Sequence, residues 1–179
     1  MIKSLLFTIM LLGFLGSSHA FQEKIPVMEA LNGEECSILK DNCEYYLCEE
    51  TRRSCGQNGY LVSFGHRYCQ KFLDTNEKKF TDEGQQWLSE VRTCLQERLR
   101  EIPEKLSCRD LKRRAFAQHV PCYIETGYCH LPRKDRRRIQ LLLMNAIFKK
   151  GIVENALKVM SACASMNNGV FPQFDNSWR

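Results

Sequence analysis

The ten cysteines are the residues of this chain with the most distinctive chemistry. Cysteines pair as disulfides or, as thiolates, bind a metal ion. No Cys-x-x-Cys motif occurs, and only Cys43 and Cys48 come close to the spacing of zinc ligands. An even number of cysteines in a secreted chain is typical of a disulfide framework. We therefore expect five disulfides and no metal site, although spacing alone does not choose among the many pairings that ten cysteines permit.

Histidines are the next candidates for chemistry, and three follow the first twenty residues: His66, His119 and His130. Catalysis needs such a group beside a nucleophile, a carboxylate or a metal. The sequence has no His-Glu-x-x-His, no Gly-x-Ser-x-Gly, no phosphate loop and no EF-hand calcium loop. Secreted phospholipases A2 place their histidine beside adjacent cysteines, whereas His66 precedes Arg67 and Tyr68. We expect His66 and His119 to be helix-surface or packing residues. We also expect the protein to be no enzyme and to need no cofactor; a small secreted hydrolase is the alternative.

A basic run is the strongest charge feature of the chain. Its members are Arg133, Lys134, Arg136, Arg137 and Arg138. A solvated helix start explains it most simply, but cations there oppose the helix dipole, which leaves room for a function. One such function is binding of a sulphated glycan or an acidic partner. Another is cleavage by a basic-site convertase, after which a bridge between Cys129 and Cys163 would hold the two fragments together.

The N-terminal residues 1–20 have the order of a secretory signal peptide. A basic start at Lys3 precedes an apolar run from Ser4 to Gly16, and small residues precede Ala20. A bilayer span needs roughly 20 apolar residues, so we expect cleavage after Ala20, a secreted extracellular protein and no membrane span. Cleavage removes one basic residue and lowers the formal net charge from +5 to +4. So mild a charge on a secreted chain argues against a nucleic-acid partner.

Helices must position these groups, because apolar residues recur at spacings of three and four through most of the chain. The clearest expected helix spans 81–100, with Thr81 as its cap. Ser107 can cap the next one, which Pro121 should end or bend. The segment from Cys122 to Cys129 could hold a short extended piece.

Three further helical regions complete the expected fold. Two span 34–50 and 60–73, and the last begins at Pro132 or Asp135 and runs to Cys163, where Gly151 could split it into two helices. The apolar positions that mark this last region are Ile139, Leu142, Leu143, Ala146, Ile147, Val153, Ala156, Leu157, Met160 and Cys163.

These signals together predict an all-α, disulfide-rich domain of about five to six helices over 34–168. A loose N-terminal arm, 21–33, would precede it, and an irregular tail, 169–179, would follow it.

Three local strings resemble the stanniocalcins, a family of secreted helical hormones. The string at 69–73 resembles the family's Cys-x-x-Phe-Leu. The string at 79–94 resembles its Lys-Phe-x-x-x-Gly helix opening that leads to a cysteine, and 122–129 resembles its Cys-Tyr-x-x-x-x-x-Cys. The three occur in the family's order and at nearly its spacing, and the resemblance extends from Cys36 to Cys163.

The resemblance implies a specific disulfide pairing. It is Cys36–Cys48, Cys43–Cys69, Cys55–Cys108, Cys94–Cys122 and Cys129–Cys163. Twelve residues of continuous helix would place Cys36 about 18 Å from Cys48, beyond disulfide reach. The region 34–50 would therefore have to break into a helical hairpin if this pair forms.

The resemblance also implies a function: binding of an extracellular protein, with roles in calcium and phosphate balance or in inhibition of pappalysin-type metalloproteases. Compared with the family, the loop between Cys55 and Cys69 is longer, the cysteine that links two subunits has no counterpart, and no Asn-x-Ser/Thr site occurs. A non-covalent homodimer stays open, as does a secreted defence or structural module. The contact candidates are the five residues of the basic run, chosen on charge alone.

Overall fold

The computed structural model describes residues 36, 39, 41–75, 79–144, 152–170 and 172. The expected signal peptide, the arm 21–33 and nearly all of the tail after Val170 lie outside these residues. All regular secondary structure in the described part of the chain is helical, and no strand occurs there. The all-α prediction is therefore confirmed.

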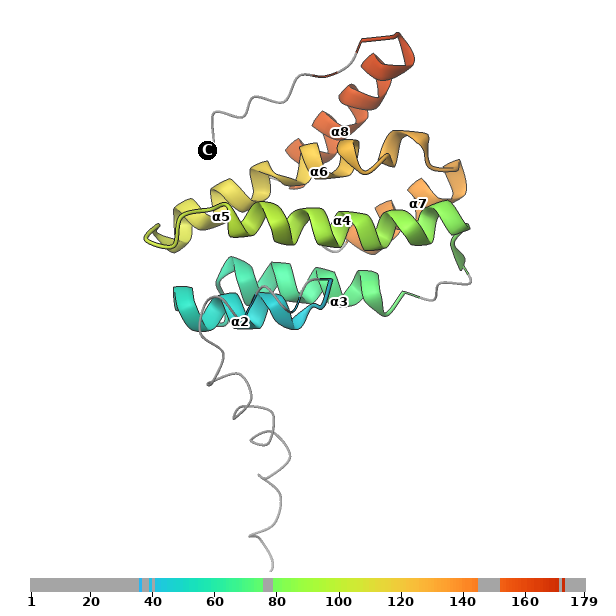
Figure 1. Cartoon of the computed structure of the whole chain (residues 1–179). Helices are drawn as coiled ribbons and strands as arrows, with labels where there is room; N and C mark the ends of the chain where they lie inside the picture. Colours follow the sequence, from blue (N-terminus) through green and yellow to red (C-terminus); the bar gives the residue numbers. More distant parts are fainter. Residues whose placement is uncertain are drawn as a thin grey trace, which may run out of the picture.

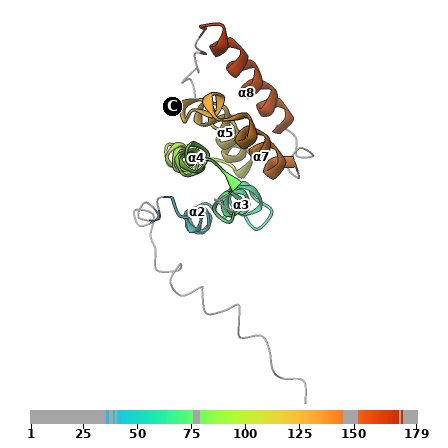
Figure 2. The ribbon, with the colours of Figure 1, turned by 90° about the vertical axis from the view of Figure 1, so that its right-hand side faces the viewer.

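The helices pack around one long central helix (Figure 1). In chain order they are α2 (Glu44–Arg53), the π-helix η2 (Leu61–His66), α3 (Arg67–Leu73), α4 (Asp82–Arg100), α5 (Cys108–Ala117), α6 (His119–Glu125), the 3-10 turn η4 (Tyr128–His130), α7 (Arg133–Leu143) and α8 (Ile152–Asn167). α4 lies between the pair formed by α2 and η2–α3 and the pair formed by α5 and α6. α8 packs on α6 and lies at the edge farthest from α2 (Figure 2).

α4 forms as its sequence predicts. The Thr81 side chain accepts a hydrogen bond from the backbone N–H of Gly84, and two acidic residues occupy the first turn. Trp87 and Val91 are completely covered on the inward face, and Trp87 meets the rings of Tyr123 and Tyr128 at 5.2 and 5.5 Å between centroids. This apolar face, with the Cys94–Cys122 disulfide, binds α4 to α6.

Five disulfides join the ten cysteines, with Cα–Cα distances of 5.2–5.7 Å. They are Cys36–Cys48, Cys43–Cys69, Cys55–Cys108, Cys94–Cys122 and Cys129–Cys163. These are the same five pairs that the resemblance implies.

The expected continuous helix over 34–50 is wrong. α2 begins only at Glu44, after a turn in which Asp41 has the left-handed φ of 61°. The Asp41 carboxylate lies 2.9 Å from Nη2 of Arg92 and 3.0 Å from the hydroxyl of Ser89, so α4 holds the turn in place. This break lets Cys36 reach Cys48, which a straight helix would prevent.

One smaller expectation also fails. The segment from Cys122 to Cys129 is helical, not extended, because α6 runs to Glu125 and η4 follows the turn at Gly127. The expectation for Pro121 is confirmed: the helix after Ser107 ends at Ala117, whose carbonyl lies four residues before Pro121, and Pro121 itself lies in the first turn of α6. A proline is tolerated there because the first amides of a helix have no intrahelical acceptor.

Candidate interaction surface

The basic run forms the first two turns of α7, and the structure divides it into two sets. Arg133, Lys134 and Arg137 are exposed, whereas Arg136 and Arg138 are half-buried. The half-buried pair has structural contacts: Arg136 Nη1 is 3.5 Å from the carbonyl oxygen of Cys129, and the Arg138 guanidinium lies 5.8 Å from the centre of the Phe80 ring. The three exposed cations are therefore the members of the run most accessible to a partner.

Asp135 fixes the position of this run. Its carboxylate is completely buried and accepts hydrogen bonds from the backbone N–H and the hydroxyl of Thr81. Gly84 leaves room for it, since a Cβ there would lie 2.7 Å from Oδ2 of Asp135. The start of α7 is thus bound to the start of α4, and the three exposed cations project from a fixed base.

Replacing Asp135 by alanine should lower the free energy of unfolding by about 2 kcal/mol, because the amide and hydroxyl of half-buried Thr81 lose a charged acceptor. Asp110→Ala is the matched control, since Asp110 bonds Ser107 and Arg113 at an exposed helix start, where we expect about 0.5 kcal/mol. Denaturant titration of both variants measures the difference, and equal losses would show that Asp135 is not the anchor.

The outward face of α7 continues from cations to apolar side chains. Arg133, Arg137, Leu141 and Met144 follow one another at spacings of four, four and three, which places them on one side of a helix. Leu141 is 57% and Met144 50% exposed. We call these four residues the α7 stripe.

α8 adds a second exposed apolar set. Val153, Leu157 and Met160 are between 52% and 61% exposed, and Ala156 is exposed as well. The buried residues of α8 are Val159, Ala162 and Cys163. α8 packs mainly on α6, and Asn155 of α8 donates a hydrogen bond to the carbonyl oxygen of Phe116 in α5. Because α8 is apolar on most of its circumference, its periodicity does not reveal which side is covered.

Contiguous exposed apolar side chains mark interaction sites more often than isolated ones do. Arginine, methionine and aromatic residues are enriched in protein interfaces, and lysine and glutamate are depleted. The α7 stripe has this composition, with arginines at one end and Leu141 and Met144 at the other. Sequence reasoning found the arginines but missed the apolar half, although the spacing of four from Arg137 to Leu141 could have indicated it.

The convertase alternative conflicts with this geometry. Proteolytic nicking concentrates at exposed loop tips with mobile backbone. Arg133 to Arg138 instead lie in a regular helix whose Asp135 side chain is completely buried. Cleavage would require this helix to unfold first, so we favour an intact chain.

His119 occupies a packing position, as the sequence suggests. Its ring stacks on Phe116 at 5.3 Å and meets the rings of Tyr60, Phe64 and Tyr123 within 6.4 Å. Burial lowers the pKa of His119 to about 4, against backbone hydrogen bonding that raises it. The adjoining cavity of ≈ 30 Å³ holds about two water molecules and is too small for a lipid ester.

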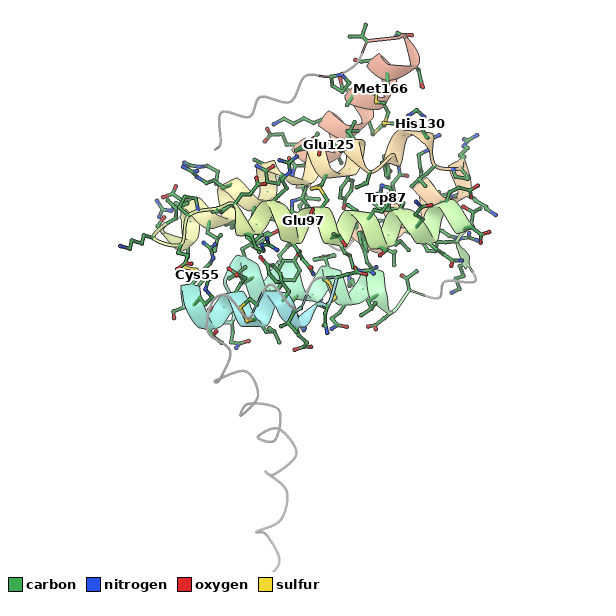
Figure 3. The ribbon with its side chains drawn as sticks, viewed as in Figure 1. Cys55, Trp87, Glu97, Glu125, His130 and Met166 are labelled. Carbon is green, nitrogen blue, oxygen red and sulfur yellow. A yellow bond between two sulfur atoms is a disulfide. The ribbon has the colours of Figure 1, made fainter. Side chains whose placement is uncertain are left out.

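His66 lies elsewhere, at the end of η2, with Nε2 3.7 Å from a carboxylate oxygen of Glu44. His130 is exposed on η4 (Figure 3). Within the described ranges no group of three or more His, Cys, Asp or Glu side chains is arranged to hold a metal ion. The same ranges contain no helix with both the length and the apolar character that a bilayer crossing requires.

Comparison with known proteins gives this chain no relative. No family model, no curated protein and no solved structure matches it. The α7 stripe is therefore identified by its exposure, its composition and its fixed backbone.

Proposed function

We propose that this chain is a secreted, stanniocalcin-like regulatory protein that acts by binding another extracellular protein through the α7 stripe. The observation that carries the proposal is the continuous outward face of Arg133, Arg137, Leu141 and Met144 on a helix anchored by Asp135. The matching partner surface has carboxylates opposite the arginines and an apolar patch opposite Leu141 and Met144.

The disulfide framework supports the stanniocalcin-like part of the proposal. All five pairs agree with those that the resemblance implies. Disulfides of this number form in oxidising compartments, which fits secretion. Because each bridge joins separate parts of the chain, the binding helix is presented on a rigid base and loses little conformational freedom when a partner binds.

A pappalysin-type metalloprotease is the first partner to test, since the resemblance implies it. The purified protein should inhibit that protease, and the triple variant Arg133→Gln, Arg137→Gln and Leu141→Gln should raise the inhibition constant by about tenfold or more. The measurement is residual proteolysis against inhibitor concentration at two salt concentrations. Raising the salt concentration should weaken inhibition by the unchanged protein more than inhibition by the variant, because the variant lacks the two arginine charges that salt screens.

The matched control removes two cations and one exposed leucine elsewhere: Arg109→Gln, Lys112→Gln and Leu73→Gln. Leu73 is 46% exposed on α3, far along the chain from the α7 stripe. Equal weakening by both triple variants would reject the α7 stripe as the contact. No inhibition by the unchanged protein would reject this protease class, and turnover in an esterase screen that disappears in His66→Gln or His119→Gln would favour the hydrolase alternative.

A further inference from the structure

We propose that the start of α5 carries a second binding site, separate from the α7 stripe, for a sulphated glycosaminoglycan chain. The site consists of Lys105, Arg109 and Lys112, which we call the α5 cluster. It goes beyond the proposed function and takes from it only secretion, since sulphated glycans are extracellular.

The α5 cluster arises from a local excess of positive charge. α5 has four cations and one carboxylate in its ten residues. Leu111 and Ala115 face the core, so Arg109 and Lys112 point outward, and both are exposed, as is Lys105 just before the helix. Arg109 and Lys112 are three residues apart and are neighbours on the helix surface.

The carboxylates of the surrounding chain are already paired with other cations. Asp110 binds Arg113 at 2.8 Å and the Ser107 hydroxyl at 2.7 Å. Glu101 lies 3.7 Å from Arg98, and Glu104 pairs with Arg52. No ion pair in the described part of the chain involves a member of the α5 cluster. Lys112 Nζ lies 6.0 Å from the centre of the Phe116 ring, a contact that does not neutralise its charge. The three charges therefore remain available to an external anion.

The backbone beneath the cluster is held firmly. Arg53 donates hydrogen bonds to the carbonyl oxygens of Ile102 and Pro103, which ties the turn before α5 to α2. The Cys55–Cys108 disulfide joins the first residue of α5 to the end of the same neighbouring segment, and Cys55 is seen at that end of the molecule in Figure 3. A sulphated chain would thus meet cations whose mutual positions change little on binding.

The α5 cluster and the exposed cations of α7 lie at opposite ends of α4 (Figure 1). α5 follows the C-terminal end of α4, whereas Asp135 binds α7 to Thr81 at its N-terminal end. The 19 residues of α4 separate these ends by about 28 Å. Exposed Glu90 and Glu97 on α4 lie along that length, so the two sets do not form one continuous basic groove.

The composition around the α5 cluster favours a polyanion over a protein. Among the described residues, α5 and the turn before it have no prominently exposed large hydrophobic side chain. A surface of Lys and Arg without apolar neighbours binds sulphate groups through charge and through the forked hydrogen bonds of the guanidinium. The α7 stripe differs because its arginines border Leu141 and Met144.

Heparin and heparan sulphate are the probes, and two variants of equal charge test the site. The first is Lys105→Gln, Arg109→Gln and Lys112→Gln; the matched control is Arg133→Gln, Lys134→Gln and Arg137→Gln. At physiological salt the first should bind heparin about tenfold or more weakly than the unchanged protein. The heparin affinity of the control should fall by less than about threefold, because its substitutions lower the net charge without touching the α5 cluster.

Equal weakening by the two variants would overturn the proposal, since it would show attraction by net charge alone. Absence of heparin binding by the unchanged protein at low salt, or equal binding of desulphated heparin, would overturn it too. A second measurement needs no variant: a heparin oligosaccharide should shift backbone amide resonances at 105–113 and not at 133–138. The protease assay of the α7 stripe is independent, so either proposal can fail alone.

Discussion

Replacing Cys55 and Cys108 together by serine should lower the free energy of unfolding by about 4 kcal/mol. This bridge closes the longest loop of the five, with a sequence separation of 53 residues. A cross-link restricts the unfolded chain more when the loop is longer, so its removal releases the most unfolded-state entropy. The measurement is guanidinium unfolding of the oxidised variant, after disulfide mapping shows that the other four pairs are intact.

The shortest loop provides the matched control. Cys36 and Cys48 are 12 residues apart, so their double serine variant should lose about 3 kcal/mol. Both bridges have Cα–Cα distances of 5.6 Å, which makes the folded-state geometry comparable. A greater loss from the short loop than from the long one would show that folded-state contacts around Cys36, and not loop entropy, dominate the stability.

Local signals predicted most helix boundaries, because each is set by groups close in sequence. Thr81 and Ser107 cap α4 and α5 where their hydroxyls suggest, and each accepts a hydrogen bond from the amide three residues later. α8 ends at Asn167 and is followed by Gly169 in the left-handed conformation. The Gly169 amide donates to the carbonyl of Met166 and the Val170 amide donates to that of Ser165, the pattern of a glycine-terminated helix.

Tertiary contacts determined what the sequence left open. The break at Asp41 depends on Arg92 and Ser89, which are about fifty residues away in the chain. The π-helical start of the 60–73 region is similar in kind: Gly65 lies so close to the Tyr46 ring that a Cβ would come within 2.4 Å of it. Periodicity within one segment holds no information about such distant partners.

The sequence predicted the charged half of the candidate surface but not the apolar half, because the apolar half depends on tertiary contacts. The exposed cations follow from their type, since charged side chains are seldom buried without a partner. Burial of Asp135, by contrast, requires Thr81, and the exposure of Leu141 and Met144 depends on which neighbours α7 lacks. An apolar residue on a helix is expected inside, so its exposure can be found only once the packing of the other helices is known.

Acidification should destabilise the fold through His119. Burial among aromatic rings lowers its pKa from 6.5 to about 4, and Nδ1 lies 2.9 Å from the carbonyl oxygen of Ala115, placed to donate to it. Between these two pKa values the unfolded chain binds a proton that the folded chain excludes. The contribution of neutral His119 is thus complete above pH 6.5 and is lost as the pH falls toward 4.

The expected loss at about pH 4.5 relative to about pH 7 is on the order of 2.5 kcal/mol from this residue. Carboxylates titrate over the same range, so the comparison must be between variants. His119→Gln, which cannot gain a proton, should lose less stability than the unchanged protein across this interval. His66→Gln is the matched control because His66 lies outside the aromatic cluster, beside Glu44.

The two histidine variants also separate this effect from a general acid response. If His119→Gln shows the same pH dependence as the unchanged protein and as His66→Gln, then protonation of His119 does not govern acid stability. If the free energy of unfolding of His119→Gln alone depends less on pH, the aromatic cluster of Tyr60, Phe116 and Tyr123 is the acid-sensitive part of the core. The aromatic rings join η2, α5 and α6, so opening of this part of the core would loosen the base of the α5 cluster before that of the α7 stripe. Heparin binding should therefore weaken on acidification before protease inhibition does.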